Sequence, residues 1–196
     1  MAIGAPSSRW RRGVRLLVGL GVAAGLALGS TVALAGDGDH THDQGAEQAE
    51  LAAVRAATAR FHRVEEAVAA GYELGWVNGA GVRIITGCVS HPTKGAMGYH
   101  YFNPELMADD DVSATEPEAL VYAPAPDGGL RLVAVEWVVR SLQSNPPGVG
   151  APPSVLGMEM HILVPPPGPA FYLAHAWVWG HNPDGMYADW NPDVRC

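Results

Sequence analysis

Residues 119–139, ALVYAPAPDGGLRLVAVEWVV, constrain the fold of this chain more than any other segment. Two apolar runs flank a turn of proline, aspartate and glycine, and this pattern is typical of a β-hairpin. Further apolar runs bounded by proline, glycine or asparagine lie at residues 76–89, 96–102, 155–164 and 170–179. The chain is therefore expected to form a mainly antiparallel sheet of about six strands.

One helix is predicted before these strands. Apolar residues recur at steps of three and four after Ala46, which predicts one long amphipathic helix that ends near Gly71. A helix followed by strands indicates an α+β fold, with the helix packed on a curled sheet. We expect residues 46–196 to form this single globular domain, preceded by a flexible polar tail at residues 36–45.

The N-terminal segment has the organisation of a secretory leader. A head with four arginines precedes an apolar run, and the run ends in the small residues Ala33–Ala35. This order predicts a signal peptide at residues 1–35, cleaved near Ala35. An uncleaved membrane anchor is the alternative. The mature protein is therefore expected to be secreted or extracytoplasmic.

The charge of the mature chain restricts its partners. All 20 acidic residues lie after the leader, which contains four of the 12 basic ones, so the mature chain carries a net charge of −12. A strongly negative domain is a poor partner for nucleic acid or anionic membranes, and a small molecule or metal ion is the expected partner. No second apolar run is long enough to cross a bilayer, so no transmembrane segment is expected in the mature protein. The sequence does not indicate an oligomeric state.

The two cysteines, Cys88 and Cys196, are expected to form a disulfide. Exported proteins fold in oxidising compartments where such bonds persist. The bond would fasten the last residue of the chain to its middle. A metal-binding or nucleophilic thiolate at Cys88 is the alternative, and it would be prone to oxidation outside the cell.

Three polar residues interrupt apolar strands. Glu136 shares its predicted strand face with Ala134 and Val138, and a carboxylate at such a position is costly unless it is paired or bound to a metal. His100 and His175 also lie in the middle of predicted strands. If the three side chains converge, they form a site for one divalent transition metal, possible in a metalloenzyme or in a simple metal-binding protein.

Four further residues are assigned to the surroundings of this site. Glu159 and His161 are reserve ligands on one predicted strand face, and Asn103 and His181 are outer partners that would orient the ligands. The same residues could instead form a metal-free polar pocket, or could have purely structural roles. The chain has no H-E-x-x-H, C-x-x-C or G-x-S-x-G motif, so its residues do not indicate a reaction.

Tryptophans offer a second functional interpretation. Period two places Trp177 and Trp179 on the face of His175, and Trp137 lies next to Glu136. An exposed set of this kind would line a cleft for a small molecule, glycan or protein in a non-enzymatic binding module. The alternative is that these rings belong to the core.

Three phrases carry a resemblance to other proteins: GAMGYHYFNP, PEALVY and HAWVWGHNPDGMYADWNPDVRC. They resemble a family of small secreted bacterial proteins of unknown function, over about Ala59 to Cys196. The resemblance implies a single secreted domain with a helix that ends in Gly-Tyr, a mid-chain cysteine and a terminal cysteine. It implies no activity and no catalytic residues.

Overall fold

The computed structural model describes residues 38–140, 149–164 and 170–196, with side chains from residue 45 onward. The predicted signal peptide and its cleavage position lie outside these residues. No helix in the described ranges combines the length and the apolar character that a membrane span requires.

The described chain consists of helices followed by strands, as expected for an α+β fold. The helical segments are α1 (Gly38–Thr58), η1 (Ala59–His62), α2 (Val64–Ala69) and η2 (Leu106–Ala108). The strands are β1 (Glu73–Leu74), β2 (Trp76–Val77), β3 (Arg83–Ile84), β4 (Val89–His91), β5 (Gly95–Phe102), β6 (Ala119–Pro124), β7 (Leu130–Arg140), β8 (Ser154–Val155), β9 (Met158–Glu159), β10 (His161–Leu163) and β11 (Phe171–Ala176).

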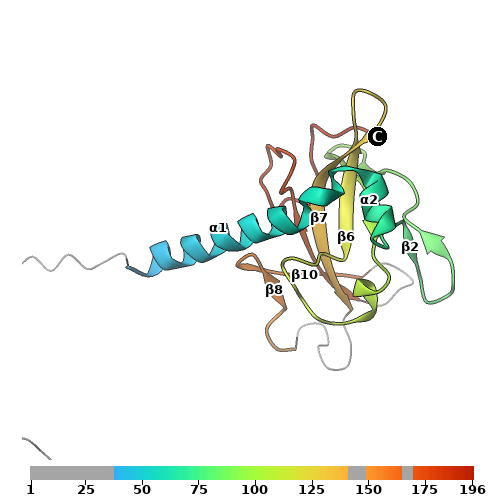
Figure 1. Ribbon diagram of the computed structural model, residues 1–196. Coiled ribbons are helices and arrows are strands. Elements are labelled where there is room, and N and C mark those ends of the chain that lie inside the picture. The colour runs from blue at the N-terminus through green and yellow to red at the C-terminus, as the bar shows by residue number, and fades with distance from the viewer. Residues whose placement is uncertain (1–37, 141–148, 165–169) are drawn as a thin grey trace, which may run out of the picture. The chain divides into compact units, whose positions relative to one another are not determined.

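Seven strands form one antiparallel sheet, in the order β1-β5-β6-β7-β11-β10 with β4 paired to β5. The predicted hairpin is confirmed as β6–β7, which lie side by side at its centre (Figure 1). Two small hairpins, β2–β3 and β8–β9, lie outside it. The sheet is not strongly curled, contrary to our expectation, because its edge strands do not pair with each other to close it.

The predicted continuous helix is interrupted at Thr58 to Arg63, and it begins at Gly38, inside the segment expected to be a flexible tail. The Thr58 hydroxyl donates to the Val54 carbonyl, an i−4 bond that bends helices. The Tyr122 hydroxyl donates to the Phe61 carbonyl, which therefore needs no helical partner. Contacts with the sheet thus replace helical hydrogen bonds at this point.

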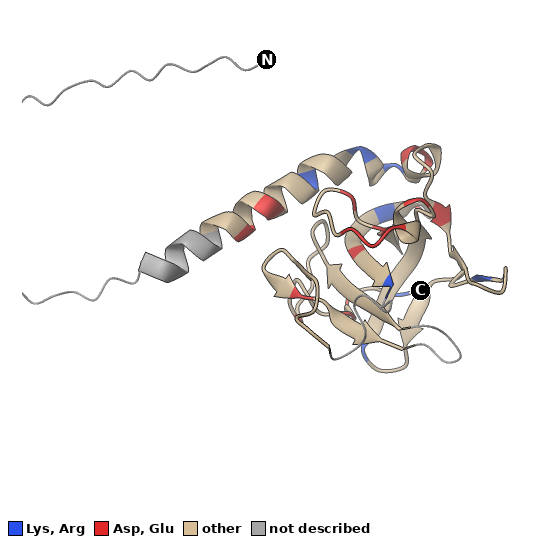
Figure 2. Cartoon of the chain, turned by 90° about the horizontal axis from the view of Figure 1, so that it is seen from below, with Lys and Arg blue, Asp and Glu red and all other residues tan. Residues whose placement is uncertain are grey.

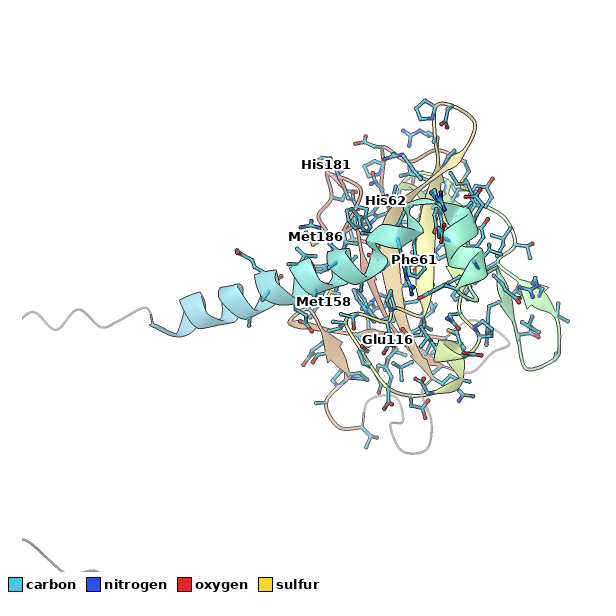
Figure 3. The ribbon with its side chains drawn as sticks, in the orientation of Figure 1. Phe61, His62, Glu116, Met158, His181 and Met186 are labelled. Carbon is cyan, nitrogen blue, oxygen red and sulfur yellow. A yellow bond between two sulfur atoms is a disulfide. The ribbon has the colours of Figure 1, made fainter. Side chains whose placement is uncertain are left out.

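The main core lies between the helical segments and one face of the sheet (Figure 1). Phe61 of η1 lies over this face (Figure 3) and makes an edge-on contact with Tyr72, with ring centroids 5.2 Å apart. Trp137 and Tyr122 are fully buried on the same side. The opposite face of the sheet carries Glu136, and Met107 of η2 packs on this face with Val138 and Phe171.

Two predicted strands are shorter than their sequence patterns suggested. Residues 155–164 contain a turn at Leu156 and Gly157, both with positive φ, which separates β8 from β9 and β10. The last strand, β11, ends at Ala176, and the Val178 amide donates to the Ala176 carbonyl, as in a tight turn. Period two therefore does not extend to residues 177–179.

The predicted disulfide is confirmed: Cys88 is bonded to Cys196, with their Cα atoms 5.7 Å apart. The C-terminal segment is also held by backbone hydrogen bonds in both directions between Ala96 and Asn191. Val194 is buried. The tail therefore packs against β4 and β5, and Cys88 is not a free thiolate ligand.

Candidate functional site

The three predicted ligands lie on a single face of the sheet, on strands β5, β7 and β11. Glu136 of β7 is directly opposite His175 of β11. On the other side, β6 places Ala119 opposite Glu136. His100 of β5 is opposite Val121 of β6, two residues beyond Ala119, so it approaches Glu136 diagonally, and its Nε2 lies 3.3 Å from Glu136 Oε1. We call these three residues the His–Glu–His row.

The row is buried, and three of its nitrogens have no partner. His100, Glu136 and His175 are 3%, 2% and 1% exposed. His100 Nδ1 and both ring nitrogens of His175 make no hydrogen bond with any residue that the structure describes. Buried polar atoms are nearly always paired, and an unpaired one costs about 1 to 3 kcal/mol. Burying these three nitrogens without hydrogen-bond partners among the described residues therefore carries a free-energy cost.

Burial and neighbouring charges shift the pKa values of His175 and Glu136. Burial lowers the pKa of His175 to about 4, and Glu136 only partly opposes this effect. Burial also pushes the pKa of Glu136 upward, but the adjacent His100, with smaller contributions from His175 and His161, outweighs it and holds that pKa below its usual value. At neutral pH the row thus combines an ionised carboxylate with a neutral imidazole at His175.

A cavity of about 320 Å³ lies over one part of the row. His100 and Glu136 line it, whereas His175 lies outside it, with its ring 5.0 Å from that of Trp177. His161 and Asp189 also line the cavity, and His161 Nε2 lies 3.9 Å from Asp189 Oδ1. The cavity therefore connects two His–carboxylate pairs.

The predicted supporting residues divide into one that joins the site and three that do not. His161 borders the cavity. Glu159 is exposed in the separate β8–β9 hairpin. The side-chain oxygen of Asn103 instead accepts hydrogen bonds from the backbone amides of Glu105 and Leu106 at the start of η2. His181 is exposed in the loop after β11 (Figure 3). These three residues therefore do not belong to the lining of the cavity.

The three tryptophans predicted to line a cleft do not line this cavity, and Trp177 and Trp179 border a separate pocket. Trp137 is fully buried in the main core, and its Nε1 donates to the Ser113 carbonyl. Trp177 is buried on the opposite side of the sheet, and Trp179 Nε1 donates to the Thr58 hydroxyl on the helical side. The two rings lie on different faces because β11 ends before them.

The aromatic walls of the cavity come from Trp76, Phe102, Phe171 and Trp190. The Trp76 and Phe171 rings meet edge-on, with centroids 5.3 Å apart. Trp76 lies in a short hairpin and Trp190 in the turn-rich tail, where no strand pattern assigns a face. The position of Trp190 near the cavity could have been inferred from the sequence, because the predicted disulfide brings the residues near Cys196 close to those near Cys88.

A metal ion would require the row to rearrange. In the described part of the chain, no three His, Cys, Asp or Glu side chains already stand in an arrangement that could hold a metal ion. His100 and Glu136 contact each other directly. An ion bound to all three residues would have to separate this pair and draw in the His175 ring. The donor set itself, two imidazoles and one carboxylate, suits divalent transition metals.

A further buried carboxyl, Glu118, ends the acidic segment 107–118, whose composition is typical of an exposed loop. Figure 2 shows acidic residues gathered in the connection between β5 and β6, which contains Glu118. Glu118 is 2% exposed, and its Oε2 accepts the Val138 amide at 2.9 Å. Burial, with smaller contributions from Asp109 and Glu116, raises its pKa from 4.5 to about 8.

Replacing Glu118 with Gln is expected to remove a pH dependence of stability. The folded state holds a proton on Glu118 that the unfolded chain releases above pH 4.5. The free energy of unfolding therefore falls as the pH rises from about 4.5 to about 8, by up to about 1.4 kcal/mol per pH unit from this group. Urea unfolding of both proteins at pH 5 and pH 8 measures the difference, and a constant difference between them would contradict the assignment.

Comparisons with known proteins add no family: no protein-family model, curated protein or solved structure matches this chain. The fold and site define an α+β domain with a disulfide and a buried His–Glu–His row. Its function has to be proposed from the chemistry of that row.

Proposed function

We propose that this chain is an exported domain that binds one divalent transition-metal ion through His100, Glu136 and His175. The observation that supports this most is the set of three unpaired imidazole nitrogens beside a buried carboxylate. Imidazole nitrogen and carboxylate oxygen are the usual protein ligands of Zn²⁺, Fe²⁺, Mn²⁺ and Cu²⁺. Coordination would give one unpaired nitrogen of each ring a partner, His100 Nδ1 and one of the two nitrogens of His175.

A purely structural role accounts less well for these residues. A buried polar group that serves stability is normally hydrogen-bonded, whereas both nitrogens of His175 are unpaired. Apolar residues of similar volume would serve the core at least as well, because burying an ionised carboxylate carries a large desolvation cost. Retaining three such residues in one row favours a ligand over packing.

The predicted leader and the disulfide support an extracytoplasmic setting. The sequence before residue 36 has a signal-peptide pattern, and the Cys88–Cys196 bond is of the kind that persists in oxidising compartments. Because Cys88 is in the disulfide, sulfur does not contribute to the proposed ligand set. A site of nitrogen and oxygen donors also has no thiolate that oxidation could destroy.

The proposal is tested by metal binding to the exported protein and two matched variants. His175→Gln removes a proposed ligand, and His181→Gln changes an exposed histidine outside the row. His40 and His42 are replaced by Gln in all three proteins, because this H-x-H pair could bind ions weakly. Each protein is stripped with a chelator and titrated with Mn, Fe, Ni, Cu and Zn by calorimetry.

We expect one ion per chain in the reference protein and in His181→Gln. The affinity of His175→Gln should be lower by at least about 100-fold, since loss of an outer partner alone costs 10- to 100-fold. Circular dichroism and an intact disulfide check the fold of each variant. The proposal is wrong if no metal in the series binds, or if His175→Gln binds as tightly as His181→Gln.

A further inference from the structure

We propose that the cavity beside the His–Glu–His row binds a small, mainly apolar molecule, neutral or cationic, that carries one nitrogen or oxygen donor atom. Aromatic amines, phenols and azoles belong to this class. The inference deepens the proposed function and rests on it for the ion that would meet the donor atom. The apolar contacts act whether or not an ion is present.

The volume and the lining of the cavity limit the size and the polarity of the ligand. Its volume of about 320 Å³ is at the lower end of the range of small-molecule pockets, about 300 to 1,000 Å³. Side chains from distant parts of the chain surround it, including Trp76, Met107, Phe171, Leu173 and Trp190. Aromatic and aliphatic walls of this kind favour a compact apolar body with a ring.

The ionisable side chains that line the cavity determine which charge the polar group of the ligand can carry. Of the residues that the structure describes, the ionisable ones in its lining are His100, Glu136, His161 and Asp189, and none is a Lys or Arg. An anionic ligand would meet two carboxylates with no permanent cation to balance them, so a carboxylate or phosphate is disfavoured. A neutral or cationic donor atom is favoured beside Glu136, a buried carboxylate of the lining.

One wall is built from strained backbone. Ile85 follows β3 and lines the cavity with a φ of 56°, although it is β-branched. Such residues rarely adopt this conformation, and those that do cluster at ligand sites. Ile85 and Ile84 both face the cavity, whereas Val82 of the same hairpin is 55% exposed and outside it. This hairpin therefore offers a matched pair of positions for a test.

The test uses 4-phenylimidazole as the probe, with imidazole and 4-phenylbenzoate as comparison compounds. The probe has a phenyl ring for the apolar walls and a neutral or cationic azole for the polar end. Imidazole lacks the apolar body, and 4-phenylbenzoate carries the disfavoured negative charge. Calorimetry is performed on the metal-free and the zinc-supplemented protein. Two variants, Ile84→Trp and Val82→Trp, place the same bulk inside and outside the cavity.

We expect the probe to bind the metal-free wild type at least ten times more tightly than either comparison compound, and more tightly again with zinc. Ile84→Trp should weaken probe binding at least tenfold and leave zinc affinity within twofold, while Val82→Trp changes neither. Equal binding of the probe to the two variants, or no binding to the wild type, would overturn the inference. Probe binding without zinc uptake would defeat the proposed function alone, and zinc uptake without probe binding would defeat the inference alone.

Discussion

Replacing Glu136 with Gln is expected to lower the metal affinity of this domain by at least about 100-fold while the fold stays intact. The change removes the negative charge from the centre of the row but keeps an amide oxygen that can accept a hydrogen bond from His100 Nε2, now 3.3 Å from the carboxylate. Competition with a chromophoric chelator measures the affinity, and thermal unfolding of the metal-free protein measures the stability.

A double variant distinguishes a functional role of the row from a structural one. In His100→Leu/Glu136→Leu both partners of the buried pair become apolar, and such replacements are often neutral or stabilising, by about 1 to 4 kcal/mol. We therefore expect the metal-free double variant to be at least as stable as the metal-free wild type and to bind no metal at the row. A loss of more than about 2 kcal/mol would instead assign the pair a structural role.

Removing the disulfide is expected to cause the largest loss of stability. The Cys88→Ser/Cys196→Ser variant opens a loop with a sequence separation of 108. In the chain-entropy model, closing a loop of this size contributes about 4 to 5 kcal/mol. The expected fall in the midpoint of thermal unfolding is on the order of 10 °C for a domain of this size. Calorimetric scans of both proteins without reductant give the comparison.

The same variant should also weaken the cavity. Asp189 and Trp190 line it from the C-terminal segment, which the Cys88–Cys196 bond anchors to the neighbourhood of β4. Binding of 4-phenylimidazole should therefore fall together with stability. Wild-type protein treated with reductant is the control, and it should behave like the double variant. A change in stability below about 1 kcal/mol would contradict the contribution assigned to this bond.

Much of the sheet and the composition of the row could be predicted from the sequence. Each of His100, Glu136 and His175 interrupts an apolar strand, and strand period alone places a side chain on one face. The β6–β7 hairpin has turn residues between two apolar runs, so its pairing is local. The disulfide follows from two cysteines in a chain with a secretory leader.

The features that could not be predicted from the sequence depend on contacts between residues far apart in the chain. The break in the helix is held by hydrogen bonds from Tyr122 and Trp179, which no local pattern near Thr58 reveals. The early end of β11 moved Trp177 and Trp179 to different faces. Two walls of the cavity, Trp76 and Trp190, come from a short hairpin and from the tail, where side chains follow turns instead of a strand period.

Imidazole NMR during a zinc titration tests the central proposal most directly. The chain has eight histidines, and ¹⁵N-edited spectra report on the ring nitrogens of each one after assignment by single substitutions. Metal binding at the row predicts that His100 and His175 change to metal-bound shifts together and saturate at one zinc ion per chain, while His62, His91 and His181 stay constant. Unchanged His100 and His175 resonances in excess zinc, or changes confined to His40 and His42, would contradict it.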